Sequence, residues 1–466
     1  MMASSRFGSK AGRLRAVAGG FLGRRRRVVI AGAAGRDFHN FNTVYRDDPG
    51  CEVLAFTATQ IPGIAGRRYP AALAGPHYPE GIAILPEAEL DALVRSRGVD
   101  EVVLAYSDLA HVEAMHLASR ILAAGADFSL LGPHRTMLAA AVPVVAVSAV
   151  RTGTGKSPAV RWLSQRLRAR GLRCAVVRHP MPYGDLAAQA VQRFAGRDDL
   201  DGAACTVEER EEYEPHLSIG NVVYAGIDYQ RVIARAASEA DLLLWDGGNN
   251  DFPFVRPDLH IVLADALRPG DESTHHPGEA CARMADVIVL SKCDSAAAAA
   301  VEALAAACRA LNPHAPIVRG ALPIALERPD AVRGRRVLVI EDGPTLTHGG
   351  MAHGAGYLAA LRAGAQSILD PRPAAVPEIA ALYAQFPHIG RVLPAVGYSP
   401  GQLDALRRTI EASGAEVVVA ATPADLGRLL DIGKPVVRVR YEFQDLDSPG
   451  LWGSVEHFLS SKGLAR

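Results

Sequence analysis

A nearly continuous apolar segment at residues 142–150 leads directly into a glycine-rich loop, and this combination limits the fold of the chain more than any other part of the sequence. The loop reads RTGTGKS at 151–157, and the apolar residues after it recur with helical spacing, which predicts a helix over 157–170. An uninterrupted apolar strand is typical of a parallel sheet that is covered on both faces. Residues 142–170 therefore predict a strand, a loop and a helix of the kind that binds phosphate.

The residue types of this loop indicate how phosphate would be held. Glycines allow backbone N–H groups to curl around phosphate oxygens, and the helix N-terminus adds a partial positive charge. We expect Lys156 to reach the β- and γ-phosphates of a nucleotide and Ser157 to ligate Mg²⁺. Val150 stands where the usual pattern has its first glycine, so an ordinary turn with a helix cap stays open as an alternative. The predicted nucleotide-binding residues of the loop are Gly153, Thr154, Gly155, Lys156 and Ser157.

A second motif, DLLLWDGG at 241–248, places an acid at the end of a predicted strand. An aspartate at such a strand end is where phosphoryl-transfer proteins hold Mg²⁺. Asp246 is therefore predicted to bind the metal together with Ser157. Lys156, Asp246 and Arg151 are the predicted catalytic residues, because Arg151 lies directly beside the loop. The alternative is a strand-ending aspartate in an ordinary turn.

A third motif, SKCD at 291–294, resembles the N-K-x-D motif with which GTP-binding proteins recognise their base, with serine in place of asparagine. The Asp294 carboxylate would accept two hydrogen bonds from the adjacent N–H groups of guanine, and the Lys292 stem would lie over the base. Both residues are predicted to bind the nucleotide, and the pattern leans toward GTP. A surface turn after a strand is the alternative.

Cationic and histidine side chains follow several of the predicted strands. In open parallel sheets, ligands bind where the strands end, and cations beside a phosphate site indicate a phosphorylated second substrate. An acidic segment at 208–214 is expected to form a solvent-exposed helix. The predicted substrate-binding residues are Arg178, His179, Arg268, His348, Arg36 and His39.

Strands and helices alternate along the chain after its first residues, which predicts an α/β fold with parallel sheets. We expect a P-loop NTPase parallel sheet, flanked by an N-terminal Rossmann-like domain and a C-terminal α/β section. The predicted parts are a basic disordered tail at 1–27, a Rossmann-like domain at 28–140, a P-loop nucleotide-binding domain at 141–340 and a C-terminal α/β section at 341–466. Strands are expected at 28–31, 52–57, 101–105, 128–131, 142–150, 173–177, 241–245, 260–264, 287–290, 336–340, 391–394, 416–420 and 436–439, and helices at 111–124, 157–170, 402–412 and 424–430.

The charge distribution excludes some classes of partner. Residues 1–27 carry eight cations and no acid, whereas the rest of the chain carries 42 cationic and 50 anionic side chains. Because residues 28–466 carry a net negative charge, they are not expected to bind nucleic acid. The sequence has no apolar run long enough for a transmembrane helix, and its six cysteines form no C-x-x-C pair. These features predict a cytoplasmic protein without nucleic-acid or membrane partners.

The motifs together resemble those of the cyclic 2,3-diphosphoglycerate synthetases, a family of P-loop enzymes. The resemblance covers roughly residues 28–460, and it implies an ATP-driven reaction that joins the two phosphates of 2,3-bisphosphoglycerate in an internal anhydride, releasing ADP and phosphate. The strings that carry it are RTGTGKS at 151–157, EEREEYEPH at 208–216, WDGGNND at 245–251, DALRPGDE at 265–272, SKCD at 291–294 and EDGPTLTHGGMAHGAG at 341–356.

The leading hypothesis is a nucleotide-driven synthetase of this family, with Mg²⁺ and ATP, or GTP, as cofactors and an anionic phosphorylated small molecule as substrate. A P-loop GTPase of the metal-delivery or chaperone type is a second hypothesis, because SKCD and the paired His275 and His276 suit it. A kinase or ligase on another phosphorylated small acid is a third. A homo-oligomer, specifically a dimer, is expected in each case.

Overall fold

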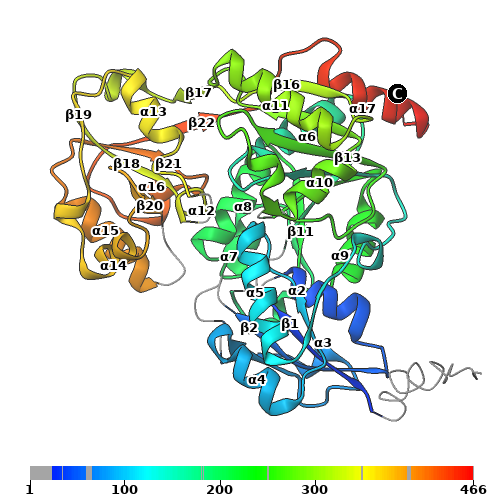
Figure 1. Cartoon of the computed structure of the whole chain (residues 1–466). Helices are drawn as coiled ribbons and strands as arrows, with labels where there is room; N and C mark the ends of the chain where they lie inside the picture. Colours follow the sequence, from blue (N-terminus) through cyan, green and yellow to red (C-terminus); the bar gives the residue numbers. More distant parts are fainter. Residues whose placement is uncertain are drawn as a thin grey trace, which may run out of the picture. The chain divides into compact units, whose positions relative to one another are not determined.

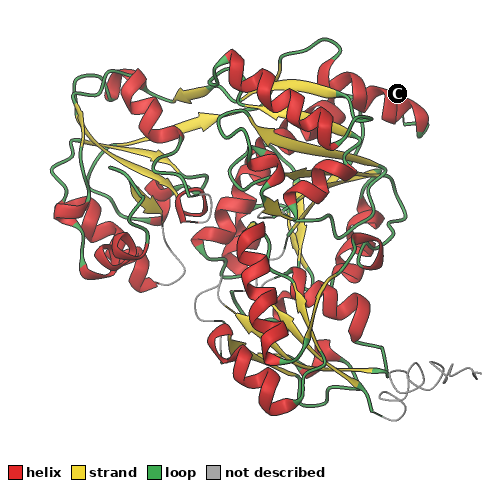
Figure 2. Ribbon diagram, viewed as in Figure 1, coloured by secondary structure: helices red, strands yellow, loops and turns green. Residues whose placement is uncertain are grey.

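The computed structural model describes residues 24–33, 35–58, 64, 66–179, 181, 183–248, 251–347, 350–395 and 400–464. Within these residues the chain forms two compact units (Figure 1). The first unit contains the residues up to 105 together with 116–135, and the second contains 106–115 and everything from 136 onward. Both units combine helices with largely parallel sheets, which confirms the predicted α/β class (Figure 2).

The first unit is built on a six-stranded sheet in the order β3-β4-β2-β1-β5-β7, in which only β3 runs antiparallel to its neighbour. An aromatic cluster that includes Phe38, Phe41, Phe56 and Tyr69 fills its core. The four strands expected here are confirmed. The elements are β1 (Arg26–Ala31), α2 (Arg36–Asn40), a π-helical turn (Phe41–Tyr45), β2 (Cys51–Ala58), β3 (Arg68–Tyr69), α3 (Ala71–Ala74), β4 (Ile82–Pro86), α4 (Leu90–Arg97), β5 (Glu101–Leu104), α5 (His111–Ala124, shared with the second unit) and β7 (Asp127–Leu130).

The second unit is centred on a sheet whose order, within the described residues, is β10-β11-β9-β12-β8-β13-β15-β16-β23. The strands from β11 to β16 in this order are parallel, and antiparallel strands lie at the two edges. The elements are β8 (Val144–Ala149), α6 (Lys156–Ala169), β9 (Cys174–Arg178), β10 (Gln192–Phe194), α7 (Arg197–Gly202), α8 (Val207–Ser218), β11 (Val222–Ala225), α9 (Tyr229–Glu239), β12 (Leu242–Asp246), β13 (Leu259–Asp265), α10 (Gly278–Met284), β15 (Val287–Ser291), α11 (Ala298–Leu311), β16 (Ile317–Ala321), β23 (Gln444–Asp445) and α17 (Gly450–Ser461). A short ribbon of β6 (Leu109–Ala110) and β14 (His275–His276) lies beside it.

Helices cover both faces of this sheet, as the uninterrupted apolar strands predict (Figure 2). Val145 and Val147 of β8 belong to the core that includes α6, α8 and α17. Val144 and Ala146 point to the opposite face and pack with α9. The alternation places both sides of β8 in apolar surroundings, and the loop after this strand is therefore held on a rigid base.

A further sheet in the second unit follows the order β17-β22-β21-β18-β19, with β20 beside β18. Its helices pack apolar residues such as Ala359, Ile379 and Leu406 against the sheet. The helix expected at 424–430 is only a single turn, which ends before the Gly433 segment. The elements are β17 (Ile324–Leu326), β18 (Arg336–Asp342), α12 (Gly343–Thr347), α13 (Ala355–Arg362), β19 (Ser367–Ile368), α14 (Pro377–Gln385), β20 (Leu393–Ala395), α15 (Pro400–Ala412), β21 (Val417–Ala421), α16 (Leu426–Leu429) and β22 (Val436–Tyr441).

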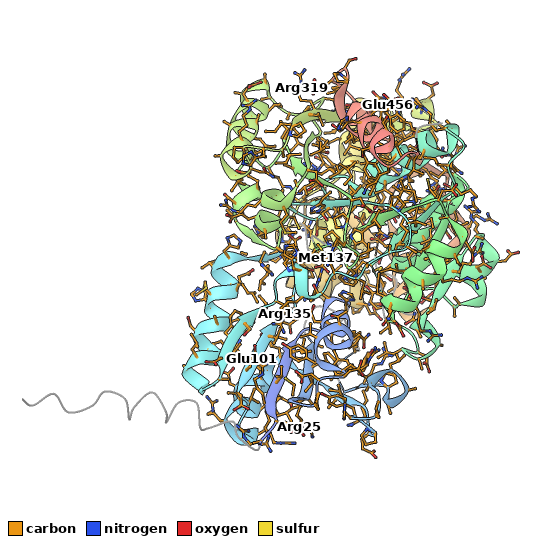
Figure 3. The ribbon with its side chains drawn as sticks, turned by 90° about the vertical axis from the view of Figure 1, so that its right-hand side faces the viewer. Arg25, Glu101, Arg135, Met137, Arg319 and Glu456 are labelled. Carbon is orange, nitrogen blue, oxygen red and sulfur yellow. The ribbon has the colours of Figure 1, made fainter. Side chains whose placement is uncertain are left out.

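The last part of the chain returns to the central sheet. β23 pairs with β16, and α17 packs against the same core as α6. Arg319 of β16 pairs with Asp447 at 2.7 Å, and Glu456 of α17 pairs with Arg170. Arg319 and Glu456 are labelled in Figure 3. The chain passes from β16 to β17 and returns from β22 to β23, so two connections join the β17–β22 sheet to the central sheet. No described helix is long and apolar enough to cross a membrane.

Candidate functional site

The glycine-rich loop joins β8 to α6, as its sequence predicts. Gly155 has a φ of +105°, which strains any larger residue, and a Cβ there would also displace the Leu322 side chain, whose Cδ1 would lie 2.4 Å away. Thr154 Oγ1 donates to Arg151 O at 2.6 Å, and Ser291 Oγ donates to Thr154 O at 2.6 Å. One hydrogen bond within the loop and one from the end of β15 therefore hold the loop in place. Val150, at the position of the missing glycine, is a buried core residue.

Lys156 opens helix α6 and lies almost entirely buried at the loop. Burial lowers the pKa of its ammonium group to about 8, although Asp246 and Asp108 act in the opposite direction. A cation that is held in a desolvated position beside a helix N-terminus gains strongly from an incoming phosphate. This is the position at which the sequence predicts the phosphate-binding lysine.

Asp246 ends β12 and is fully buried among polar partners. Arg178 Nη1 lies 2.6 Å from Asp246 Oδ2 and donates to Ser157 Oγ at 3.0 Å, while Ser157 Oγ lies 3.4 Å from Asp246 Oδ1. Burial alone would raise the pKa of Asp246, but Arg178 and His216 lower it. The structure thus brings together three residues that the sequence predicts at the site, Ser157, Arg178 and Asp246.

This donor set fits Mg²⁺. A hydroxyl and an ionised carboxylate are the hard oxygen ligands that Mg²⁺ prefers, and the Arg178 guanidinium between them shows that the position suits positive charge. Ser157 and Asp246 are the residues that would hold the ion beside nucleotide phosphates.

Two residues that the sequence did not single out complete the surroundings of Asp246. His216 Nε2 lies 2.9 Å from Asp246 Oδ2, and Asn221 Nδ2 lies 3.2 Å from His216 Nδ1. Both side chains are buried. The only signal in the sequence was the position of His216 at the end of the EEREEYEPH string, and Asn221 carried none.

Residues 208–214 form a helix, as predicted, but the prediction that this helix is exposed to solvent is wrong. The helix α8 is present, but Glu208, Glu209, Glu211 and Glu214 are all buried. Glu209 caps the helix through Thr206, Glu214 pairs with Arg210, and Glu211 accepts a hydrogen bond from Thr422 on the other sheet. Thr206 and Arg210 are local partners, whereas Thr422 is 211 positions away from Glu211, a contact that charge patterning does not reveal.

Arg151 is held in ion pairs behind the loop. Its Nε lies 2.8 Å from Asp108 Oδ1, and its Nη1 lies 3.1 Å from Asp271 Oδ2. Asp108 also accepts from the backbone N–H of Thr152 at 3.3 Å. The two acids fix Arg151 beside the loop, and its predicted catalytic role stays a prediction.

Arg268 and Lys292 share one buried acid. Arg268 Nη2 donates to Thr152 O at 2.7 Å and lies 2.9 Å from Asp265 Oδ2, to which Lys292 Nζ donates at 2.6 Å. Arg268 therefore contacts the loop directly.

Asp294 is engaged within the chain. Its Oδ1 accepts from Leu322 N at 2.9 Å, and its Oδ2 accepts from Ser295 Oγ at 3.1 Å. Both oxygens are therefore used to shape the loop after β15, and base recognition by Asp294 stays a prediction.

A cavity of about 860 Å³ extends from the glycine-rich loop to the β17–β22 sheet. Its lining includes Gly153, Lys156 and Ser157 of the loop region and Glu341 and Asp342 of β18. Thr345 lies between these two groups, because its Oγ1 donates to Asp342 at 2.5 Å and lies 3.7 Å from the position that a Cβ would take at Gly153. Further lining residues are Arg161, Arg178, Glu211, Arg438, Arg440 and Tyr441.

The carboxyl groups of this cavity are strongly perturbed. Burial, with Asp342 nearby, raises the pKa of Glu211 well above its ordinary value. Burial also raises the pKa of Glu341 to about 7, against the opposing effect of backbone N–H donors from Tyr357, Gly356 and Gly354. A cationic group that enters the cavity would stabilise the ionised form of these carboxyl groups, in place of the protons that they otherwise retain.

The remaining predicted substrate residues lie in several places. His179 Nε2 pairs with Asp251 Oδ2 at 3.2 Å beside Gly248. Arg36 and His39 are buried in α2 of the first unit, and His348 lies outside the described residues. No group of three or more potential metal ligands among His, Cys, Asp and Glu occurs within the part of the chain that the structure describes.

The loop, the buried lysine and the strand-end aspartate define a nucleotide-dependent enzyme of the P-loop class. Arginine synthetase ArcE from Thermococcus kodakarensis is 53% identical to this chain over 428 residues, which cover 92% of this chain and 96% of that protein. The chain therefore belongs to the same family, the cyclic 2,3-diphosphoglycerate synthetase family that its motifs resemble. It is a nucleotide-dependent synthetase.

More distant similarities are found to a kinase and to two proteins of known structure. Tetraacyldisaccharide 4'-kinase from Anaeromyxobacter dehalogenans strain 2CP-C is 32% identical over 313 residues, covering 62% of this chain and 73% of that protein. The structure of LpxK from Aquifex aeolicus in complex with ATP gives a TM-score of 0.42 at 14% identity, covering 70% of this chain and 90% of that one. The hydrogenase maturation factor HypB from Archaeoglobus fulgidus gives a TM-score of 0.24 at 17% identity, covering 38% of this chain and 79% of that one. No family model matches the chain.

Proposed function

We propose that this chain is an ATP-dependent synthetase that forms arginine. The observation that carries the proposal is that one cavity is lined both by the phosphate-binding loop and by the carboxyl groups of Glu211, Glu341 and Asp342. The name of the relative at 53% identity, arginine synthetase, agrees with a cavity whose lining suits both phosphate and a basic amino acid.

The reaction follows from what nucleotide cleavage can supply. A guanidinium group forms from a ureido group when the ureido oxygen is converted into a leaving group. In the proposed reaction, the γ-phosphoryl group of ATP passes to the ureido oxygen of citrulline, and ADP leaves. Ammonia then attacks the isourea carbon, and phosphate departs with the former ureido oxygen. ATP, citrulline and ammonia thereby give ADP, phosphate and arginine.

The residues of this chain have defined tasks in that reaction. Lys156 and the N–H groups of the loop bind the phosphates and stabilise the charge that develops on the transferred group. Ser157 and Asp246 would hold Mg²⁺, which neutralises phosphate charge when it is bound. Glu211 and Asp342 bind the nitrogen atoms that become cationic in the product. Because phosphoryl transfer depends mainly on positioning, the rigid base of β8 is part of this function.

A second candidate is formation of cyclic 2,3-diphosphoglycerate from 2,3-bisphosphoglycerate. The observation in its favour is that Arg161, Arg438 and Arg440 line the same cavity, since arginine side chains suit phosphate groups. In this alternative the γ-phosphoryl group passes to one substrate phosphate, and the second substrate phosphate displaces it. ATP is the nucleotide proposed in both cases. A homodimer and a cytoplasmic location stay predictions.

One assay distinguishes the two candidates. The purified chain is incubated with ATP and Mg²⁺ and with either citrulline plus ammonium or 2,3-bisphosphoglycerate, and products are followed by phosphorus NMR and amino-acid analysis. The proposal predicts ADP and arginine in equal amounts in the first reaction only. A cyclic pyrophosphate signal in the second reaction, without arginine in the first, would establish the alternative. A matched preparation of Glu211→Gln should retain ATP binding while it loses arginine formation.

A further inference from the structure

A chain of three buried side chains connects the P-loop helix to the strand-end aspartate. Ser164 lies on α6, Asn221 precedes β11 and His216 lies on α8. Asn221 Nδ2 donates to Ser164 Oγ at 3.0 Å and lies 3.2 Å from His216 Nδ1. His216 Nε2 lies 2.9 Å from Asp246 Oδ2. Ser164, Asn221 and His216 are all buried.

The direction of each hydrogen bond in this chain is determined by its neighbours. Ser164 Oγ donates its proton to Arg161 O at 2.8 Å, so it accepts from the Asn221 amide. The second hydrogen of the same amide points at His216 Nδ1, which must therefore be an acceptor. The imidazole proton is then on Nε2, and His216 donates it to Asp246.

This arrangement determines how Asp246 presents its carboxylate. Its Oδ2 is taken by His216 and Arg178, whereas its Oδ1 faces Ser157 Oγ at 3.4 Å. Without the imidazole donor, Asp246 Oδ2 would keep only Arg178 as a partner, and the orientation of the carboxylate would be less well defined. Donors of this kind that orient a ligating group are known to be worth about 10–100-fold in metal affinity.

We propose that His216 and Asn221 are positioning residues that orient Asp246 for the metal-bound nucleotide. They hold Asp246 Oδ1 toward Ser157, and Asn221 determines which nitrogen of His216 carries the proton. These polar side chains are buried between two helices, where a polar group without a hydrogen-bond partner is costly. The chain of hydrogen bonds ends at Asp246, one of the two predicted Mg²⁺ ligands. The inference concerns nucleotide binding, and it stands whichever substrate occupies the far end of the cavity.

The test measures binding rather than turnover. The dissociation constant of a non-hydrolysable ATP analogue is measured by calorimetry with Mg²⁺ and with EDTA, and the ratio of the two values gives the gain due to Mg²⁺. His216→Leu is expected to reduce this gain by about 10-fold or more and to leave binding in EDTA unchanged. His216→Gln is expected to keep most of the gain due to Mg²⁺, because the glutamine amide can donate to Asp246.

A matched control separates positioning from stability. His260 is also a buried histidine, and its Nε2 lies 3.1 Å from Ser148 Oγ, with no contact to Asp246. His260→Leu is expected to lower stability without changing the gain due to Mg²⁺. If His216→Leu does not fold, Asn221→Ala provides the same test, because it removes the donor to His216 Nδ1. A wild-type gain in either variant, or an equal loss in His260→Leu, overturns the proposal. Arginine formation in the wild type is a separate readout, so its absence would refute the proposed function alone.

Discussion

Replacing Glu341 with glutamine should change the pH dependence of stability in a predictable direction. The Glu341 carboxyl group is buried at the end of β18, where its oxygens accept from Tyr357 N at 2.8 Å and Gly356 N at 3.2 Å. Burial raises its pKa from 4.5 to about 7. Between these two pH values the folded chain keeps a proton that the unfolded chain has lost, so this group destabilises the fold progressively as the pH rises.

The size of the effect follows from the shift. A change from 4.5 to about 7 corresponds to about 3 kcal/mol when the carboxyl group is fully ionised. Glutamine does not titrate, so Glu341→Gln escapes this cost at high pH. Whatever hydrogen bonding the substitution loses, the free energy of unfolding of the variant should rise relative to that of the wild type by about 2.5 kcal/mol between pH 5 and pH 8.

Urea unfolding followed by tryptophan fluorescence measures this difference, because all three tryptophans, Trp162, Trp245 and Trp452, lie in the second unit. Glu416→Gln serves as the control in the same sheet. A backbone hydrogen bond from Arg336 lowers the pKa of Glu416. The stabilisation that the Glu416 carboxylate gives to the fold is therefore fully present above the ordinary pKa of a glutamate, and it should not change between pH 5 and pH 8. A difference for Glu341→Gln that is the same at both pH values would refute the reasoning.

Four other changes have defined outcomes. Lys156→Ala removes the buried ammonium group at the loop and should lower kcat for ATP cleavage by about 10²–10³-fold, as measured by ADP release. Asp246→Asn removes one of the two carboxylates that pair with the buried Arg178, the other being Glu212, and should cost about 2 kcal/mol in urea unfolding. Ser291→Ala loses the hydrogen bond to the loop, and calorimetry should show weaker ATP binding by about 1 kcal/mol. If Asp294 recognises the base, as its motif predicts, Asp294→Asn should change the ratio of kcat/KM for ATP and GTP, and an unchanged ratio would contradict base recognition and leave its hydrogen bond from Leu322 N as its role.

The central strand, loop and helix were predictable because their signals are local. The apolar run at 142–150 and the helical spacing after it determine β8 and α6, and the observed elements Val144–Ala149 and Lys156–Ala169 agree with them closely. The departure of Val150 from the P-loop pattern has a tertiary reason instead, since this residue packs in the core beside α10. Asp246 followed from the same kind of signal, an acid directly after four apolar residues.

The surroundings of Asp246 were not predictable in the same way. His216 and Asn221 reach Asp246 and the P-loop helix from separate elements, and neither residue lies at a spacing that marks a site. The burial of α8 depends on contacts such as that between Glu211 and Thr422, which are 211 positions apart. Patterns along the chain report periodicity, whereas these contacts depend on how the sheets pack.

The third motif shows a different limit. Residues 291–294 resemble a base-recognition motif, but Ser291 supports the loop, Lys292 pairs with Asp265 and Asp294 accepts from Leu322. Each of these partners comes from an element that is distant in sequence. A short motif predicts which residues lie near the nucleotide loop, and the folded structure determines which of their atoms are already engaged.

An isotope experiment tests the proposed chemistry most directly. Citrulline labelled with ¹⁸O in its ureido group is incubated with the chain, ATP, Mg²⁺ and ammonium, and the products are analysed by mass spectrometry. If the ureido oxygen accepts the phosphoryl group, arginine forms and the released phosphate carries the label. Arginine together with unlabelled phosphate, or ATP cleavage without arginine, would contradict the proposed function.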